Sequence, residues 1–119
     1  LAFYPADRSR GCTIELTKFR DAYQTLFGAD VVVLPVSVDS MSSHVSWAHE
    51  IKFPFPLVTD PSQTVATQYG STMGGRPFDA RTVYVIGRDG KIVYRNLRFG
   101  ALDERAYATL KDEVAKARD

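Results

Sequence analysis

Hydrophobic residues follow two different periodicities along this chain, and their alternation predicts strands that alternate with helices. Continuous apolar runs occupy residues 1–4 and 31–38, and the second run is rich in β-branched residues, as in a strand buried on both faces. Between them, apolar residues recur at steps of three and four, which predicts a helix from Ser9 at its N-cap to a stop at Gly28. Cys12 would then take the third helical position.

The same alternation continues beyond residue 38. Ser42 or Ser43 is expected to cap a second helix that reaches Ile51, because the apolar residues there again repeat with helical spacing. Two prolines follow, which end helical structure and begin a short extended run at residues 57–59.

The remaining elements are a short helix, a hairpin and a final helix. Asp60 or Ser62 is expected to cap the short helix. Residues 82–86 and 92–97 are strand-like runs joined by an Asp-Gly turn, which is a strong hairpin signal. From Asp103 onward, the apolar residues fall on one face of an amphipathic helix.

The resulting order, β-α-β-α-β-α-β-β-α, predicts one α/β domain over residues 1–119. Its sheet is expected to be mostly parallel with one antiparallel hairpin strand and to carry helices on both faces. Sites in such sheets form at the carboxyl ends of the strands. Because Cys12 directly follows the first strand, it lies where a site is expected.

Composition narrows the classes of function. The chain has 119 residues, of which 45% are hydrophobic, and its net charge of +1 argues against nucleic acid or an anionic membrane as its main partner. No apolar run approaches the roughly 20 residues that cross a bilayer. A single cysteine and two histidines predict no zinc site, and we expect no cofactor. Since one cysteine forms no internal disulfide, a reducing, cytoplasmic location is the simpler expectation.

The candidate for chemistry is Cys12, since a helix N-terminus favours the thiolate form of a thiol. A lone cysteine is most commonly a small buried core residue. The polar and small residues on either side of Cys12, from Asp7 to Thr13, weaken that interpretation.

Pro5, Ser9 and Cys12 stand in a Pro-x-x-x-Thr/Ser-x-x-Cys arrangement that resembles the peroxiredoxins, and more specifically the alkyl hydroperoxide reductase/thiol-specific antioxidant (AhpC/TSA) family. Further similar segments follow in the family's order at residues 36–40, 55–60, 69–70 and 81–92. The resemblance implies a thioredoxin-like fold. It also implies a thiol-dependent peroxidase that reduces hydrogen peroxide or organic hydroperoxides.

The resemblance implies roles for five residues. Cys12 would be the nucleophile that attacks the peroxide, and Arg81 would supply guanidinium donors. Ser9 would supply a hydroxyl, and Pro5 would shield the reactive sulfur from bulk water. Glu15 would hold an arginine in place through charge-assisted hydrogen bonds.

Each of these roles has a simpler competitor. Ser9 could serve only as the helix cap, Glu15 could only favour the helix dipole, and Arg81 could be a surface arginine. The rivals of Arg81, in order of preference, are Arg76, Arg20 and Arg10. His44 is expected to be a structural or capping residue.

The absence of a second cysteine favours a one-cysteine mechanism, in which an external thiol resolves the sulfenic acid. Thr17 stands where the bacterioferritin-comigratory branch of the family often carries a resolving cysteine. A thioredoxin-like protein or a low-molecular-weight thiol would be the reductant. The resemblance also implies that the chain could form a homodimer. Family members normally begin with a further hairpin and half of the central strand, so we expect an N-terminally incomplete sequence.

Two functions from other classes stay open. A thioredoxin-like thiol–disulfide oxidoreductase would need a Cys-x-x-Cys pair, whereas Glu15 occupies the second position of that pair here. A non-catalytic binding domain would keep Cys12 only as a relic. It would have no physical need for the polar residues around the cysteine.

Overall fold

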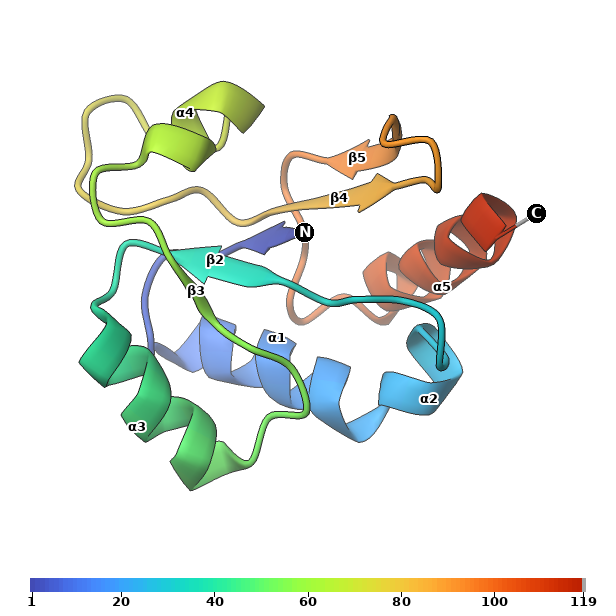
Figure 1. Cartoon of the computed structure of the whole chain (residues 1–119), viewed down its shortest axis with the longest axis horizontal. Helices are drawn as coiled ribbons and strands as arrows, with labels where there is room; N and C mark the ends of the chain where they lie inside the picture. Colours follow the sequence, from blue (N-terminus) through green and yellow to red (C-terminus); the bar gives the residue numbers. More distant parts are fainter. Residues whose placement is uncertain (119) are drawn as a thin grey trace.

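A five-stranded mixed sheet in the order β3-β2-β1-β4-β5 forms the centre of the molecule (Figure 1). In this computed structural model, which describes residues 1–118, the strands are β1 (Ala2–Phe3), β2 (Pro35–Ser37), β3 (Val58–Thr59), β4 (Thr82–Ile86) and β5 (Ile92–Asn96). Strands β1, β2 and β3 pair in parallel, whereas β4 pairs antiparallel with both β1 and β5. The predicted α/β sheet with one antiparallel strand is therefore confirmed, and the antiparallel strand is β4.

Helices cover both faces of this sheet, as expected. They are α1 (Arg10–Asp21), α2 (Tyr23–Leu26), α3 (Met41–Ile51), α4 (Thr64–Tyr69) and α5 (Glu104–Arg118). Helix α4 lies on one face, and α1, α2, α3 and α5 lie on the other (Figure 1).

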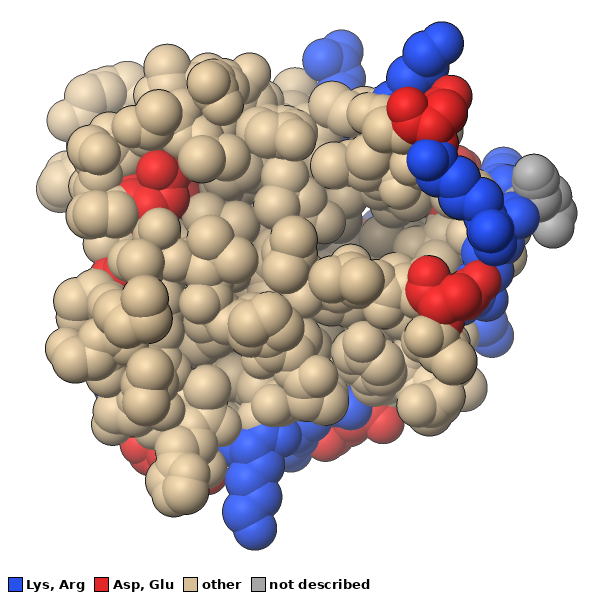
Figure 2. Space-filling view, in the orientation of Figure 1, with Lys and Arg blue, Asp and Glu red and all other residues tan. Residues whose placement is uncertain are grey.

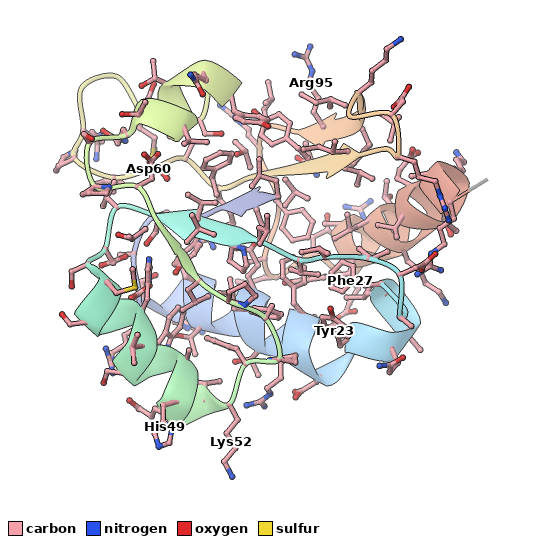
Figure 3. The ribbon with its side chains drawn as sticks, viewed as in Figure 1. Tyr23, Phe27, His49, Lys52, Asp60 and Arg95 are labelled. Atoms are coloured by element: carbon pink, nitrogen blue, oxygen red, sulfur yellow. The ribbon has the colours of Figure 1, made fainter. Side chains whose placement is uncertain are left out.

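The two faces follow from the alternation of side chains along the strands. Phe3 and Tyr84 belong to the smaller core cluster beneath α4, whereas Tyr4, Val83 and Val85 belong to the larger cluster beneath α1 and α5. In Figure 3, the larger cluster fills the space between the sheet and these helices. The C-terminal end of β1 leads through the loop at residues 4–9 into the first turn of α1.

The strand expected at residues 31–38 is shorter than predicted. Only Pro35–Ser37 is a strand, and Val32 is 75% exposed instead of buried. Ala2 pairs with Pro35, so residues 31–34 extend past the start of β1. Within residues 1–118, the pairing with β1 begins at Pro35, and a β-branched run is assigned as a strand only where a neighbour completes the hydrogen-bonding ladder.

The helix expected to run to Gly28 is divided into two. Helix α1 ends at Asp21, the backbone leaves the helical conformation at Ala22 with φ −105°, and α2 follows as a single turn. Gly28, with φ +76°, follows α2 and accepts the left-handed conformation that most residues avoid. The apolar spacing correctly predicted which face of the helix is buried, but it did not predict the interruption at Ala22.

The caps also differ from expectation. Ser40 caps α3, because its hydroxyl accepts a hydrogen bond from the Ser43 N–H at 3.2 Å; neither Ser42 nor Ser43 is the cap. At α4, the side chain of Asp60 accepts the N–H groups of Val65 and Ala66. Asp60 is labelled beside this helix in Figure 3. Asp60 thus performs the capping that was predicted for it, from a position several residues before the helix.

Charged side chains gather along one edge of the face shown in Figure 2, over the β4–β5 hairpin and the end of α5. Arg88 and Arg118 both pair with Asp30 there. A hollow of about 460 Å³ opens at this edge, beside Leu1 and Val33. It lies at the N-terminal end of β1, opposite the end from which the chain enters α1.

Candidate active site

Cys12 is the third residue of α1 and is fully buried. The first hydrogen bond of the helix runs from the Thr13 N–H to the Ser9 carbonyl at 2.8 Å. The N–H groups of Arg10, Gly11 and Cys12 therefore have no acceptor within the helix. These three donors, with the helix dipole, create a positive environment around the sulfur.

Ser9 occupies the N-cap position, but its side chain does not cap the helix. The hydroxyl instead donates to the Ala6 carbonyl at 3.0 Å. The expectation of a capping hydroxyl is therefore wrong, because the side chain is turned toward the Ala6 carbonyl and accepts no hydrogen bond from the first-turn N–H groups. As a result, the side chain of Ser9 leaves the first-turn amides to other acceptors.

Arg81 is brought to Cys12 by the pairing of β1 with β4. Phe3 pairs with Thr82, which places the preceding Arg81 beside the end of β1. Its Nη1 lies 3.4 Å from the Sγ atom of Cys12. Two residues that lie 69 positions apart in the sequence are thus in direct contact at the site.

Of the three rival arginines, Arg20 and Arg76 contact other groups, and Arg10 is the first residue of α1. Arg20 donates to the Ile51 carbonyl and pairs with Asp21. Arg76 lies over the ring of Phe78. Of the arginines in residues 1–118, Arg81 is the one with a hydrogen bond to Cys12.

Glu15 is fully buried one turn after Cys12, and it binds the same guanidinium. Its Oε1 accepts from Arg81 Nη1 at 2.7 Å, while its Oε2 is buried and has no hydrogen-bond partner within residues 1–118. Burial raises the pKa of Glu15 to about 7, against the opposing effect of Arg81. Burial would lower the pKa of Arg81, but the neighbouring Glu15 and Cys12 raise it above its usual value. The guanidinium is therefore firmly cationic.

Gly11 is a residue of the site whose steric role sequence reasoning missed. A Cβ atom built at this position would lie 2.7 Å from Arg81 Nη2, which is closer than real side chains approach. The absence of a side chain lets the guanidinium lie against the first turn of α1. The available signal was the glycine directly before the cysteine, in a position where a helix would tolerate larger residues.

Pro5 and Ser9 lie on the loop between β1 and α1, and both are half-buried. Neither has a hydrogen bond to the Cys12 sulfur in the described structure. The shielding role of Pro5 stays a prediction. A shallow depression of about 470 Å³ adjoins the site and is lined by Gly11, Arg81 and residues 100–103.

Two further findings concern residues 1–118. No three side chains of the His, Cys, Asp and Glu types are grouped there so as to bind a metal ion. None of the helices in this range combines the length and the apolar character needed to span a bilayer.

The architecture is that of a thioredoxin-like protein, and solved structures agree. The crystal structure of peroxidoxin BcpB from Mycobacterium tuberculosis superimposes with a TM-score of 0.83 at 27% identity, covering 99% of this chain and 78% of that one. A structure of the Xanthomonas campestris bacterioferritin comigratory protein gives a TM-score of 0.82, also at 27% identity, over 98% of this chain and 77% of that one.

The chain belongs to the AhpC/TSA family, whose model matches residues 1–95. It is 39% identical over 98 residues to the "Putative peroxiredoxin bcp" of Coxiella burnetii, which covers 77% of this chain and 65% of that relative. It is 36% identical over 99 residues to the chloroplastic peroxiredoxin Q of Sedum lineare, covering 79% of this chain and 52% of that protein. The chain thus spans between about half and two thirds of the length of these relatives.

Proposed function

We propose that this chain is a thiol-dependent peroxidase that reduces hydrogen peroxide or organic hydroperoxides through a sulfenic acid on Cys12. The observation that supports this most strongly is the 3.4 Å contact between Arg81 Nη1 and the Cys12 sulfur. A buried sulfur beside a guanidinium and a helix N-terminus suits a nucleophilic thiolate. Family membership supports the same chemistry, and the related Xanthomonas campestris protein has been studied structurally for its alkyl peroxide reduction activity.

The proposed step is a displacement at oxygen. The Cys12 thiolate attacks one oxygen of the hydroperoxide, an S–O bond forms, and the O–O bond breaks. The sulfur gives up two electrons, and the departing oxygen leaves as alkoxide or hydroxide, which takes one proton to become an alcohol or water. The products are the sulfenic acid of Cys12 and the alcohol or water formed from the hydroperoxide.

The surrounding donors stabilise charge that moves from sulfur to the departing oxygen. Arg81 can donate to both the sulfur and the bound peroxide, since Nη2 lies beside the start of α1. The first-turn amides of Gly11 and Cys12 add donors without rearrangement. Ser9 already donates to Ala6, so its oxygen is suited to accept the O–H of the hydroperoxide.

Access to the sulfur requires local movement, because Cys12 has no exposed surface. The depression lined by Gly11, Arg81 and residues 100–103 adjoins the site, and none of the residues that line it belongs to the loop at residues 5–9. We infer that the peroxide enters there, with Pro5 limiting the entry of water.

An external thiol would complete the cycle, because Cys12 is the only cysteine of the sequence. A thiol condenses with the sulfenic acid to a mixed disulfide and water, and a second thiol releases the Cys12 thiol with a new disulfide. A thioredoxin-like protein or a low-molecular-weight thiol fits this role. Such a cycle calls for a reducing compartment, and we propose the cytoplasm as that compartment.

The test is the peroxide-dependent modification of Cys12. Wild type and Cys12→Ser are mixed with hydrogen peroxide and a sulfenic-acid trapping reagent, and the adduct is located by mass spectrometry. We expect an adduct on Cys12 of wild type and sustained peroxide consumption when dithiothreitol is present. Equal peroxide consumption by wild type and Cys12→Ser would contradict the proposal.

A further inference from the structure

A buried carboxylate outside the described site anchors the loop that carries Pro5 and Ser9. The carboxylate of Asp7 accepts hydrogen bonds from the hydroxyls of Tyr4 and Ser43, both at 2.7 Å. His44 Nδ1 lies 2.8 Å from the same carboxylate. The side chains of Asp7 and His44 are each only 2% exposed. Three partners, one directly after β1 and two on α3, thus meet at one carboxylate in the interior.

The backbone of this loop is held at the same point. The Asp7 N–H donates to the carboxylate of Asp39 at 2.8 Å, and the Ser37 hydroxyl donates to that carboxylate at 2.6 Å. Both the main chain and the side chain of Asp7 are therefore bound to the segment formed by β2 and α3.

The neighbouring contact between this loop and α3 is of a different kind. Arg8 has φ +65°, an uncommon conformation for a non-glycine residue, and its guanidinium pairs with Glu50 at 3.0 Å. Both side chains are largely exposed, and exposed ion pairs contribute little. Asp7 is therefore the residue that fixes the loop.

The position of this loop bears directly on the proposed chemistry. Ser9 follows Asp7 by two residues, and the orientation of its hydroxyl depends on Ala6, the residue before Asp7. A shift of the loop therefore changes the direction of this hydroxyl and the cover of the Cys12 sulfur. Displacements of about 1 Å in positioning groups can lower a rate by about a hundredfold.

We propose that Asp7 is a positioning residue of the peroxidase site. Through its hydrogen bonds to Tyr4, Ser43 and His44, it holds the loop that carries Pro5 and Ser9 in the reactive arrangement. The proposal rests on the peroxidase function proposed above. Within the described residues, Asp7 has no hydrogen bond to Cys12 or Arg81, so its replacement leaves the hydrogen bonds of Arg81 to Cys12 and Glu15 in place. Its effect should therefore appear in the reaction with peroxide and not in the reactivity of the thiolate as such.

The experiment compares two reactions of the same sulfur. Asp7→Asn keeps the shape of the side chain but turns one acceptor oxygen into a donor that faces other donors. Its rates with hydrogen peroxide and with iodoacetamide are measured at equal pH, and circular dichroism verifies folding. Glu50→Gln, which removes only the charge from the exposed pair with Arg8, is the matched control.

Should Asp7→Asn fail to fold, Ser43→Ala takes its place, with Ser42→Ala as its control. Ser43→Ala removes a single hydrogen bond to the carboxylate. The backbone N–H of Ser43, which Ser40 caps, stays intact.

We expect the peroxide rate of Asp7→Asn to fall by about tenfold or more, while alkylation by iodoacetamide is unchanged or faster. Ser43→Ala should show a smaller loss of the peroxide rate, again without a loss of the alkylation rate. Both control variants should match wild type in both rates. Unchanged peroxide rates, or peroxide and alkylation rates that fall together, would overturn the positioning role. Failure of wild type itself to react with peroxide would instead overturn the proposed function together with this inference.

Discussion

Replacing Glu15 with glutamine removes a buried charge from the site at almost constant volume. In wild type, Glu15 has no exposed surface, one oxygen is bound to Arg81 at 2.7 Å, and the other oxygen has no hydrogen-bond partner within the described residues. The fold therefore favours the neutral carboxyl, and burial raises the pKa of Glu15 from 4.5 to about 7.

The raised pKa determines the sign of the pH dependence. A group that is more basic in the folded state stabilises the fold fully below its unfolded pKa, and it loses this contribution as pH rises through its folded pKa. For Glu15 the loss falls between pH 4.5 and about 7. The rise in pKa corresponds to about 3 kcal/mol of unfolding free energy. Relative to Glu15→Gln, wild type should therefore become less stable across this window.

Urea unfolding at a series of pH values measures this difference, with the fluorescence of the single buried tryptophan, Trp47, as the signal. We expect the stability of Glu15→Gln minus that of wild type to increase by about 3 kcal/mol from low pH to above neutrality. Glu104→Gln is the control, because the Glu104 side chain is 81% exposed and pairs only at the surface with Lys18. That variant should follow the pH dependence of wild type.

A pH-independent difference would refute this reasoning, and so would a difference of opposite sign. A pH-independent difference would mean that the ion pair with Arg81 just offsets the cost of burying Glu15, and a difference of opposite sign would mean that the ion pair outweighs that cost. The buried unpaired oxygen would then need another explanation.

Three further variants test other parts of the site and the fold. Gly11→Ala should lower the peroxide rate with little loss of stability, because the new Cβ displaces the flexible end of Arg81; stopped-flow kinetics and urea unfolding measure the two effects. Ser9→Ala should lower the peroxide rate by about tenfold or more while Ser9→Thr retains it, because only the hydroxyl is needed; equal rates for both would contradict this. Asp60→Ala should cost about 1 kcal/mol in urea unfolding through loss of the α4 cap, without changing the reactivity of the thiol.

Much of the fold was predictable from local patterns. The order of strands and helices follows from hydrophobic spacing, and the β4–β5 hairpin follows from its Asp-Gly turn. The errors arose where tertiary structure decides. The run at residues 31–34 has the composition of a strand, but within residues 1–118 the pairing with β1 begins only at Pro35. The break at Ala22 interrupts a continuous apolar face without a sequence marker.

The site was predictable in part, for a related reason. Cys12 could be found from its place after the first strand, and Arg81 from the resemblance to a family. Asp7 could not be found in this way, because its importance comes from contacts with α3, more than 30 residues away. Similarly, only the structure shows that the hydroxyl of Ser9 turns to Ala6 instead of capping α1.

In the proposed mechanism, Arg81 acts on the peroxide as well as on the thiolate. The direct test is the second-order rate constant of hydrogen peroxide with Cys12, divided by the measured thiolate fraction, in wild type and Arg81→Ala. Arg76→Ala serves as the control, because this exposed arginine lies over Phe78 and not at the sulfur. We expect a loss of about a hundredfold or more for Arg81→Ala after this correction and none for Arg76→Ala. Corrected rate constants that agree for wild type and Arg81→Ala would contradict the mechanism.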